Sequence, residues 1–316
     1  MTDSREQLLI VNEFHPETVS ILDSNYQTHH LWEVDQDERK DFVQSLDGKC
    51  RAATSASWLC DNIIYQLNSL EIIAAFGVGV DAIDFNETGK ANIKVTNTPD
   101  VLNDAVADLA IALILATTRN LINADQYVRS RKWEEAPFPF GTGLAGKTLG
   151  IAGLGRIGEA IARRALPFNL NIAYHNRSPK DNPYQYYPDL CELAANSDIL
   201  LCMLPGGTAT DNLINAEVLD CLGPHGIFIN VGRGNSVDEQ ALYSALAEGR
   251  IAGAGLDVYK NEPSVPDDFL DLSNIVLLPH IGSATVETRR AMGNLVIENL
   301  SAFFAGKPLL TEVAQN

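Results

Sequence analysis

The sequence predicts an α/β fold built from two parallel-sheet domains, each Rossmann-like or flavodoxin-like. Two observations lead to this fold class. Short apolar segments alternate with helical stretches along almost the whole chain, a rhythm that is typical of βαβ units. The length of 316 residues is also long for one domain and comfortable for two.

The first domain is expected to contain five short strands and to cover residues 1–98. A helix at 17–22 should follow the first strand, because Pro16 suits the first turn of a helix. The five strands are expected at 8–11, 31–34, 52–54, 72–76 and 93–96. A second helix should follow the third strand, with apolar positions at Trp58, Leu59, Ile63 and Ile64.

A turn and a long apolar helix come next. Thr98, Pro99 and Asp100 form a turn signal and a candidate hinge. The helix, from residue 103 to about 128, is apolar nearly all round, so it must be covered on all sides. Burial within the monomer and burial against a second subunit would both achieve this.

Aromatic side chains follow this helix in a segment that also contains proline and glycine. Trp133, Phe138 and Phe140, if exposed, suit an arm that clasps a partner. The alternative is that they pack on their own domain. We expect the region of about 103–145 to act as a dimerisation helix and arm.

The strand–helix alternation resumes at Thr148 and forms a second domain. The last helix, 285–304, has an apolar stripe but no strand to join there, so we expect it to pack on the first domain. The second domain, 99–284, is then inserted into a first domain made of 1–98 and 285–316. Its six strands are expected at 148–152, 172–174, 199–203, 226–231, 254–258 and 275–278, with a helix at 159–168 after the first.

The charge balance excludes several kinds of partner. The chain has 23 basic and 41 acidic residues, which gives a net charge of −18 and a pI near 4.6. Neither nucleic acid nor an anionic membrane is attracted to such a field. An anionic substrate must therefore be held by a local positive group.

The chain carries no signal for export and no pattern for a metal site. No apolar run approaches the ~18 residues that span a bilayer, and the N-terminus is too polar for a signal peptide. The five cysteines are odd in number and have no C-x-x-C spacing. We expect reduced structural thiols, no metal and a cytoplasmic location.

A glycine-rich turn near the middle of the chain predicts dinucleotide binding. Gly153, Gly155 and Gly158 have the G-x-G-x-x-G spacing between a short apolar strand and a helix. Gly153 makes the tight turn, Gly155 lets the backbone approach a pyrophosphate, and Gly158 lets the helix pack close to the strand. The helix N-terminus offers free N–H groups to the phosphates. The alternative is a βα turn that binds no ligand.

The end of the next strand predicts which dinucleotide binds. An NAD-type site places an acid there to hold the ribose 2′-hydroxyl, whereas this strand ends in His175, Asn176, Arg177 and Ser178. Arg177 can pair with a 2′-phosphate, and Asn176 and Ser178 can hydrogen-bond it. The sequence therefore predicts that the protein prefers NADPH as its cofactor, with NADH as the other possible cofactor. The alternative is a surface arginine in a loop.

A second glycine-containing loop follows the fourth strand of the first domain. Gly77 and Gly79 flank Val78 at the carboxyl end of that strand, the edge at which open α/β sheets bind ligands. A ligand could lie there against bare backbone. An ordinary βα loop explains the same residues equally well.

Seven motifs in one order resemble the D-isomer-specific 2-hydroxyacid dehydrogenases over essentially the whole chain. The resemblance is strongest to glyoxylate/hydroxypyruvate reductases and hydroxyphenylpyruvate reductases. It implies a homodimeric two-domain enzyme that binds a small 2-keto acid in the cleft between its domains and reduces it to the D-2-hydroxy acid. The motifs are Gly77–Asp81, Asn97–Leu102, Gly153–Gly158, Asn230–Gly234, Ala254–Val258, Asn261–Pro263 and Pro279–Ser283.

The catalytic trio of the family falls on Arg233, Glu262 and His280. Arg233 can clamp the substrate carboxylate in a bidentate pair and polarise the carbonyl. A protonated His280 can donate to the carbonyl oxygen as negative charge grows there. Glu262, if hydrogen-bonded to His280, favours the imidazolium and fixes its orientation.

The resemblance also implies the remaining contacts. The backbone N–H groups of Val78 and Gly79 would cradle the substrate carboxylate, and Ser283 and Trp133 would contact substrate. Trp133 resembles an aromatic that related dimers insert into the neighbouring active site. Cofactor contacts are expected at Gly153, Leu154, Gly155, Arg156, Ile157, Gly158, Asn176, Arg177, Ser178, Pro205, Thr210, Val231, Asp257, His280 and Gly282.

Two other functions remain compatible with the sequence. One is an NAD-linked oxidation of another D-2-hydroxy acid, which cofactor preference would distinguish. The other is a nucleotide-sensing protein of the same fold, because fold alone does not fix function. The presence of Arg233, Glu262 and His280 together favours an enzyme, since a sensor does not require them.

Overall fold

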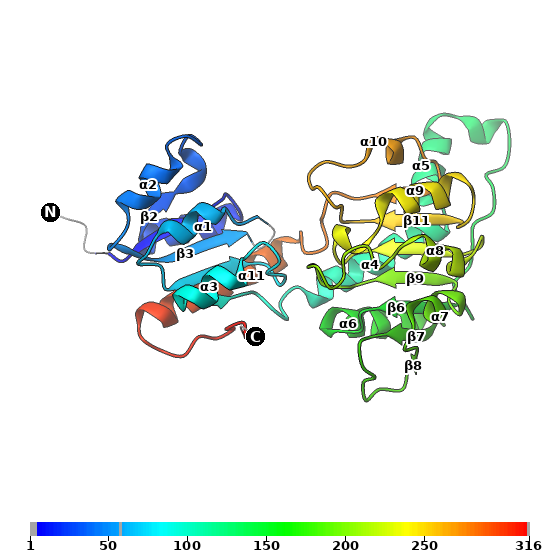
Figure 1. Cartoon of the computed structure of the whole chain (residues 1–316). Helices are drawn as coiled ribbons and strands as arrows, with labels where there is room; N and C mark the ends of the chain where they lie inside the picture. Colours follow the sequence, from blue (N-terminus) through cyan, green and yellow to red (C-terminus); the bar gives the residue numbers. More distant parts are fainter. Residues whose placement is uncertain (1–4, 57–58, 315–316) are drawn as a thin grey trace. The chain divides into compact units, whose positions relative to one another are not determined.

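The computed structural model describes residues 5–56 and 59–314. The chain divides into two compact units (Figure 1). Unit 1 consists of Met1–Leu102 and Thr285–Asn316, and unit 2 of Asn103–Ala284. Each unit is a parallel β-sheet with helices on both faces, so the predicted α/β fold class with two parallel sheets is confirmed.

The sheet of unit 1 has five parallel strands in the order β2-β1-β3-β4-β5. This order reverses between β1 and β3, which is the flavodoxin-like arrangement. Every residue of β4 is buried, as expected for a central strand covered on both faces. The strands are β1 (Gln7–Ile10), β2 (Gln27–His30), β3 (Cys50–Ala56), β4 (Ile72–Phe76) and β5 (Lys94–Thr96).

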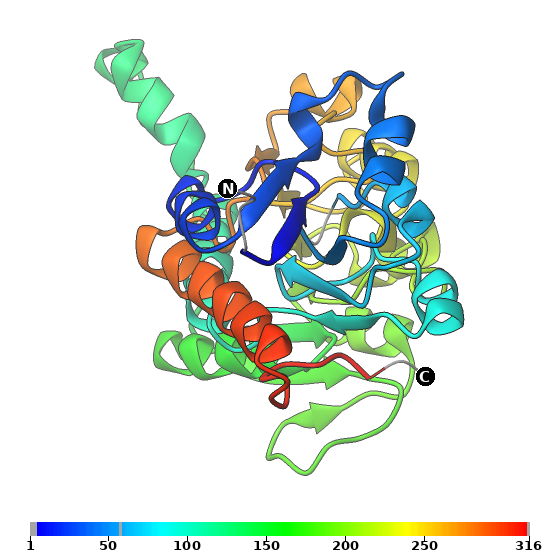
Figure 2. The ribbon, with the colours of Figure 1, turned by 90° about the vertical axis from the view of Figure 1, so that its left-hand side faces the viewer.

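Helices cover both faces of this sheet. Helix α1 (Pro16–Asn25) packs on α11 (Val286–Phe304), which also contacts β4 and is drawn in orange to red in Figure 2. The apolar cluster on the other face includes side chains of α2 (Arg39–Ser45), α3 (Phe85–Ala91) and the 3₁₀ helix η2 (Asn62–Gln66). The last helix of the chain is therefore part of the unit that contains the first strand.

Two predictions for unit 1 are wrong in detail. The second strand is not at 31–34: those residues begin with the 3₁₀ helix η1 (Leu31–Glu33), and β2 precedes them. β2 is a polar edge strand, so it lacks the apolar signal that identified the others. Among the described residues between β3 and β4 there is no α-helix: η2 is a 3₁₀ helix, and the exposed Leu59 precedes it. Trp58 lies outside the described residues.

The sheet of unit 2 has seven parallel strands in the order β12-β11-β10-β9-β6-β7-β8. The order reverses between β6 and β9, as in a dinucleotide-binding sheet. The two-residue edge strand β8 (Gln185–Tyr186) was not predicted from the sequence. The other strands are β6 (Thr148–Ala152), β7 (Asn171–His175), β9 (Ile199–Cys202), β10 (Ile227–Asn230), β11 (Gly253–Leu256) and β12 (Ile275–Leu277).

Two helix layers cover the sheet of unit 2. On one face α4 (Asn103–Thr118) packs on α6 (Arg156–Ala165) and on β10, β11 and β12. Short 3₁₀ segments η4 (Leu166–Phe168) and η5 (Gly234–Ser236) follow α6 and β10. The apolar cluster on the other face lies under α7 (Leu190–Ala195), α8 (Ala216–Leu222), α9 (Glu239–Ala247) and α10 (Asp267–Leu270).

The helix predicted at 103–128 is two helices. Asn120 adopts a left-handed conformation with φ 52°, which ends α4 and starts α5 (Leu121–Arg129). α4 is buried on several sides within unit 2, whereas α5 has no buried residue. Figure 2 shows α5 in blue-green, extending away from the rest of its unit.

Helix length bears on the question of a membrane span. Within residues 5–56 and 59–314, no single helix is long and apolar enough to cross a bilayer. Helices α4 and α5 together have the length and composition of a membrane span, but they bend by 59° at their junction.

Candidate active site

The glycine turn after β6 contains two glycines that the fold itself requires. Gly153 has φ 100°, and a Cβ there would lie 2.6 Å from the carbonyl oxygen of Met203. A Cβ on Gly158 would lie 2.6 Å from the carbonyl oxygen of Gly153. Both positions therefore exclude a side chain.

Gly155 differs from these two glycines, because a Cβ on it would meet no described atom within 4 Å. It is the N-cap of α6, and no side chain caps this helix. As a glycine it has no side chain that could accept from the first amides of α6, a helix that begins where the strand order reverses. Open space beside Gly155 at this helix N-terminus fits a pyrophosphate.

The difference between these glycines gives a testable pair of variants. Gly155→Ala is expected to keep the melting temperature of the wild type and to raise the KM for the cofactor by about tenfold or more, because its methyl group enters only the space for the pyrophosphate. Gly153→Ala is expected to lower the melting temperature, since its Cβ collides with backbone in an unfavourable φ region. Thermal melts and cofactor kinetics on both proteins measure this. A large loss of stability in Gly155→Ala would contradict the assignment.

The end of β7 holds the glycine turn in place. The Asn176 side chain accepts from the backbone N–H of Leu154 at 2.8 Å and donates to its carbonyl oxygen at 3.3 Å. Asn176 therefore braces the turn, a role that the sequence did not reveal. Arg177 and Ser178 follow it and are exposed.

Arg233 stands at the carboxyl end of β10 in a tightly bound loop. Its carbonyl oxygen accepts from Asn230 Nδ2 at 3.0 Å and from Ser236 Oγ at 2.6 Å. Its guanidinium donates to the carbonyl oxygen of Gly232 at 2.9 Å. The buried Asn230 also accepts from the Gly232 N–H at 3.0 Å, so one amide side chain fixes the backbone on both sides of the loop.

A close backbone approach brings this loop to the segment that carries Glu262. A Cβ on Gly234 would lie 1.9 Å from the carbonyl carbon of Tyr259, so only glycine fits there. The backbone N–H of Tyr259 donates to Glu262 Oε1 at 2.9 Å. The positive charge of Arg233 also acts on the Glu262 carboxylate.

Glu262 and His280 form a hydrogen-bonded pair. His280 Nδ1 lies 2.6 Å from Glu262 Oε2, and the two side chains are 32 % and 27 % exposed. Burial raises the pKa of Glu262, but the hydrogen bonds from His280 and the Tyr259 N–H, with the charges of His280 and Arg233, outweigh it and lower that pKa. The pair is therefore a carboxylate beside an imidazole whose Nε2 is turned away from the carboxylate.

A buried carboxylate holds the backbone that follows His280. Asp257 is 1 % exposed and accepts from the N–H groups of Ile281 and Gly282, both at 2.8 Å. Burial raises the pKa of this carboxyl group. His280 itself has φ 52°, a conformation that a non-glycine residue keeps only where its neighbours impose it. Asp257 supplies that constraint, and the half-buried Ser283 lies directly after it.

The glycine loop of unit 1 is fixed by Asn97. Asn97 Nδ2 donates to the carbonyl oxygen of Val78 at 2.8 Å, and Gly77 adopts φ 149°. In a trans peptide the N–H points opposite to the C=O, so the Gly79 N–H points away from Asn97. The loop thus presents a backbone donor, as the predicted carboxylate cradle requires.

The other predicted cofactor residues lie at the carboxyl ends of β9 and β10. Thr210 Oγ1 is 2.7 Å from the carbonyl oxygen of Pro205, which closes a turn in an exposed loop. Val231 is buried, and its N–H donates to the carbonyl oxygen of Cys202. No group of three or more His, Cys, Asp or Glu side chains in the described ranges could hold a metal ion.

Sequence reasoning did not identify Asn230, Ser236, Tyr259 and Asn97 as parts of the site. The side chains of Asn97, Asn230 and Ser236 bond to backbone groups, and the backbone N–H of Tyr259 donates to Glu262; such contacts depend on the folded loops. The one available signal was Asn230, a polar residue at the end of an apolar strand, where a buried amide must find partners.

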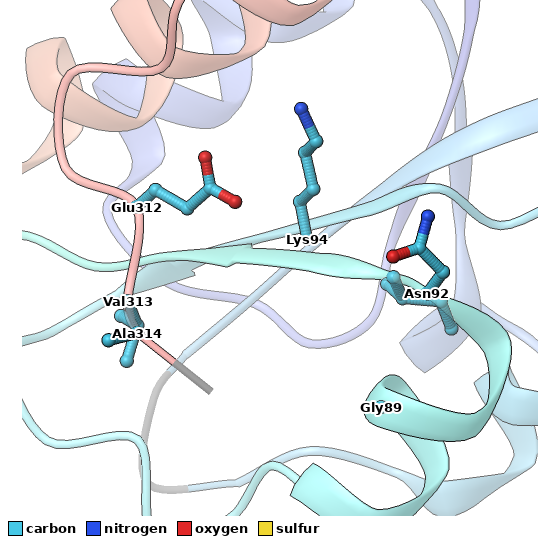
Figure 3. A pocket seen from close by; sticks show the side chains of 7 residues that line it. Gly89, Asn92, Lys94, Glu312, Val313 and Ala314 are labelled. Atoms are coloured by element: carbon cyan, nitrogen blue, oxygen red, sulfur yellow. The ribbon is translucent and has the colours of Figure 1, made fainter. Parts of the chain in front are cut away.

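A separate pocket of about 350 Å³ lies in unit 1, where the C-terminal segment passes β5. Figure 3 shows Lys94 between Glu312 and Asn92 in its wall. None of the predicted site residues lines it.

Comparison with known proteins identifies the family. The model of the NAD-binding domain of D-isomer-specific 2-hydroxyacid dehydrogenases matches residues 111–282. Hydroxyphenylpyruvate reductase of Plectranthus scutellarioides is 47 % identical over 300 residues, which is 92 % of this chain and 94 % of that protein. Glyoxylate/hydroxypyruvate reductase A of Arabidopsis thaliana is 50 % identical over 272 residues, 86 % and 85 % of the two chains.

Solved structures agree with these relatives. The NADPH-dependent glyoxylate/hydroxypyruvate reductase of Sinorhizobium meliloti, in complex with NADP and malonate, superposes with a TM-score of 0.91 at 42 % identity, covering 99 % of this chain and 98 % of that one. A 2-hydroxyacid dehydrogenase of Ketogulonicigenium vulgare has the same TM-score at 38 % identity, with 98 % of both chains covered. The chain belongs to the D-isomer-specific 2-hydroxyacid dehydrogenase family and is an NAD(P)-dependent oxidoreductase.

Proposed function

We propose that the protein is an NADPH-dependent reductase that converts glyoxylate, hydroxypyruvate or a related 2-keto acid to the D-2-hydroxy acid. The observation that carries this proposal is the Glu262–His280 pair, with Nδ1 and Oε2 2.6 Å apart and the Arg233 charge acting on the same carboxylate. Relatives at 47–50 % identity are named as reductases of 2-keto acids, which supports the same reaction.

The residues of unit 2 have distinct tasks in this reaction. His280 donates a proton from Nε2 to the carbonyl oxygen, because Glu262 holds its Nδ1 and stabilises the imidazolium. Arg233 binds the substrate carboxylate and adds positive charge where the oxyanion develops. When bound, the nicotinamide cofactor supplies the hydride. Val78 and Gly79 of unit 1 stay predicted substrate contacts, as does Ser283 of unit 2.

A panel of 2-keto acids assayed with both reduced cofactors tests this function. We expect turnover of small 2-keto acids with a higher kcat/KM for NADPH than for NADH, followed by the loss of reduced nicotinamide absorbance. Faster turnover of D-2-hydroxy acids with NAD would favour the oxidative alternative. Cofactor binding without turnover of any 2-keto acid would favour a nucleotide sensor.

The proposed NADPH preference rests on Arg177 and Ser178. Both are exposed after β7, next to the Asn176 brace, and no acidic side chain takes the place of Arg177 there. Arg177→Ala is expected to lower kcat/KM for NADPH by about tenfold or more, while kcat/KM for NADH changes little, because only NADPH carries the 2′-phosphate. Steady-state kinetics with both cofactors measure the ratio. Equal losses with the two cofactors would contradict the assignment.

We also propose that the protein is a homodimer joined by α5 and the arm after it. α5 has no buried residue, and the side chains of Trp133 and Phe140 are 66 % and 105 % exposed. Phe138 instead packs edge-on against Tyr127, with ring centroids 5.3 Å apart. An apolar surface that its own unit leaves bare suits a second copy of this chain.

The arm gives a prediction for solution mass. Replacing exposed apolar side chains of the arm, as in Ile122→Glu with Phe140→Ser, is expected to convert a dimer into a monomer. Light scattering after size-exclusion chromatography measures this. A monomeric wild-type protein would contradict the proposal.

The predicted contact of Trp133 with substrate has its own test. If Trp133→Ala keeps the wild-type relative rates on small and aromatic keto acids, that contact is contradicted.

A further inference from the structure

The C-terminal segment adds a short antiparallel pairing to the open edge of β5. Glu312 forms an antiparallel bridge with Thr96, and the Val313 N–H donates to the carbonyl oxygen of Val95 at 2.8 Å. β5 is the last strand of the unit 1 sheet, so the backbone groups on its outer edge need partners. Residues 311–313 supply part of them.

Thr311, the first residue of this pairing, holds both backbone groups of Asn97. The Asn97 N–H donates to the carbonyl oxygen of Thr311 at 3.3 Å, and Thr311 Oγ1 donates to the carbonyl oxygen of Asn97 at 2.7 Å. Asn97 comes directly after β5, at the carboxyl end of the sheet. Its backbone position therefore depends on the Thr311 hydroxyl as well as on the strand before it.

A fully buried asparagine of α11 fixes Thr311 in turn. Asn299 Nδ2 donates to Thr311 Oγ1 at 2.9 Å and to the carbonyl oxygen of Leu295 at 2.8 Å. Asn299 Oδ1 accepts from the N–H groups of Leu310 and Thr311 at 3.0 and 3.3 Å. A buried amide whose donors and acceptor are all bonded is costly to rearrange. Because Asn299 donates to the Thr311 oxygen, the hydroxyl hydrogen of Thr311 is left to donate to Asn97.

Asn97 and Thr98 pass this constraint to the glycine loop after β4. Asn97 Nδ2 donates to the carbonyl oxygen of Val78 at 2.8 Å, and the Thr98 N–H donates to that of Gly77 at 2.9 Å. Two successive carbonyl groups of the loop are thus held. In a trans peptide the direction of the C=O fixes that of the next N–H. The two N–H groups are those of Val78 and Gly79, the donors of the predicted carboxylate cradle.

We propose that Thr311 is a positioning residue for substrate binding and that Asn299 holds it in this role. A hydrogen-bonded path leads from α11 through Thr311 and Asn97 to the cradle, wholly within unit 1. The inference rests on the proposed function, in which the Val78 and Gly79 N–H groups bind the carboxylate of a 2-keto acid. Thr311 acts through Asn97, since its hydroxyl is already bonded to two side-chain and backbone partners.

Thr311→Val tests the proposal, because valine keeps the β-branched shape of threonine and removes only the hydroxyl. The KM for the 2-keto acid is expected to rise about three- to tenfold, the range for loss of one hydrogen bond. The kcat should change little, because the cradle binds the carboxylate equally in the ground state and the transition state. The KM for the cofactor should also stay unchanged, since the predicted cofactor residues belong to unit 2. Thr311→Ser keeps the hydroxyl and should retain the wild-type KM.

Ser69→Ala is the matched control. Ser69 is also half-buried in unit 1, and its Oγ donates to the carbonyl oxygen of Cys50 at 2.7 Å, the same length as the bond from Thr311 to Asn97. Cys50 begins β3 and Ser69 precedes β4, so this bond lies at the amino ends of the strands, the opposite edge of the sheet. Its loss should leave the KM for the 2-keto acid unchanged. An equal rise of that KM in Ser69→Ala would reveal a general loss of order in unit 1 and overturn the proposal.

Hydrogen exchange without substrate tests the path by itself. In Thr311→Val the peptide that contains Gly77 and Gly79 is expected to exchange its amide hydrogens faster than in the wild type, whereas in Ser69→Ala it should not. Mass spectrometry measures this. Unchanged exchange of this peptide in Thr311→Val, or an unchanged KM for the 2-keto acid, would overturn the inference. Failure of the proposed function is a different result: the wild-type protein would then turn over no 2-keto acid, and the exchange rates would still decide whether Thr311 orders the loop.

Discussion

A His280→Ala variant is expected to lose about 10²–10⁴-fold in kcat while it keeps the wild-type affinity for the cofactor. General acid catalysis by a positioned side chain contributes a factor of this size. The expectation rests on the Nδ1–Oε2 distance of 2.6 Å to Glu262, which leaves Nε2 as the atom that can reach substrate. Single-turnover kinetics and cofactor titration together measure it. A variant with near-normal kcat would remove His280 from the proposed mechanism.

Glu262→Gln is the matched control for this variant. Glutamine keeps the size and one hydrogen-bonding oxygen but removes the negative charge that stabilises the imidazolium. Because the pKa of Glu262 is lowered, its carboxylate is charged throughout the neutral range in the wild type. Glu262→Gln is therefore expected to lower kcat at neutral pH and to lose the fall in activity on the acid side that protonation of this carboxylate causes in the wild type. A merely structural role of Glu262 would lower activity equally at all pH values.

The strands and the glycine turn could be predicted because they depend on local sequence. The apolar segments at β4 and β6 are buried on both faces of a parallel sheet, so nearly all their residues are apolar. Gly153 and Gly158 could be predicted because the turn permits no side chain at either position. β2 escaped prediction because an edge strand of polar residues has no apolar pattern.

The break between α4 and α5 could not be predicted from apolar periodicity. Arg119 and Asn120 interrupt an otherwise continuous helical pattern, and asparagine enters the left-handed region more readily than most residues. The consequence is large, because α4 lies inside unit 2 whereas α5 is exposed. Periodicity alone predicted one helix and left open what covers it.

The candidate site was only partly visible in the sequence. Arg233, Glu262 and His280 were identified by resemblance, because a lone charged residue or histidine has many ordinary explanations. Their supports, Asn230 and Asp257, act by accepting from or donating to backbone groups many residues away or across a turn. Such contacts follow from the folded course of the chain, and no spacing rule encodes them.

Arg233→Ala is expected to lower kcat/KM for the 2-keto acid by about 10²–10³-fold, because removing one partner of a desolvated charge pair costs 2–5 kcal/mol. The loss should appear in KM and kcat together, since the guanidinium both binds the carboxylate and polarises the carbonyl. The loop itself should persist, because Asn230 and Ser236 hold the carbonyl oxygen of residue 233 whatever its side chain. Melting temperature and cofactor KM should therefore change little.

Arg233→Lys separates charge from geometry at the same position. Lysine keeps the positive charge but cannot form the bidentate pair, so it should recover only part of the loss. Full activity in Arg233→Lys would show that charge alone suffices, and unchanged kcat/KM in Arg233→Ala would exclude Arg233 from substrate binding. Because Arg233 is one of the charges that lower the pKa of Glu262, its removal should also raise that pKa. The acid limb of activity in Arg233→Ala is then expected at higher pH than in the wild type, an effect that loss of binding alone would not produce.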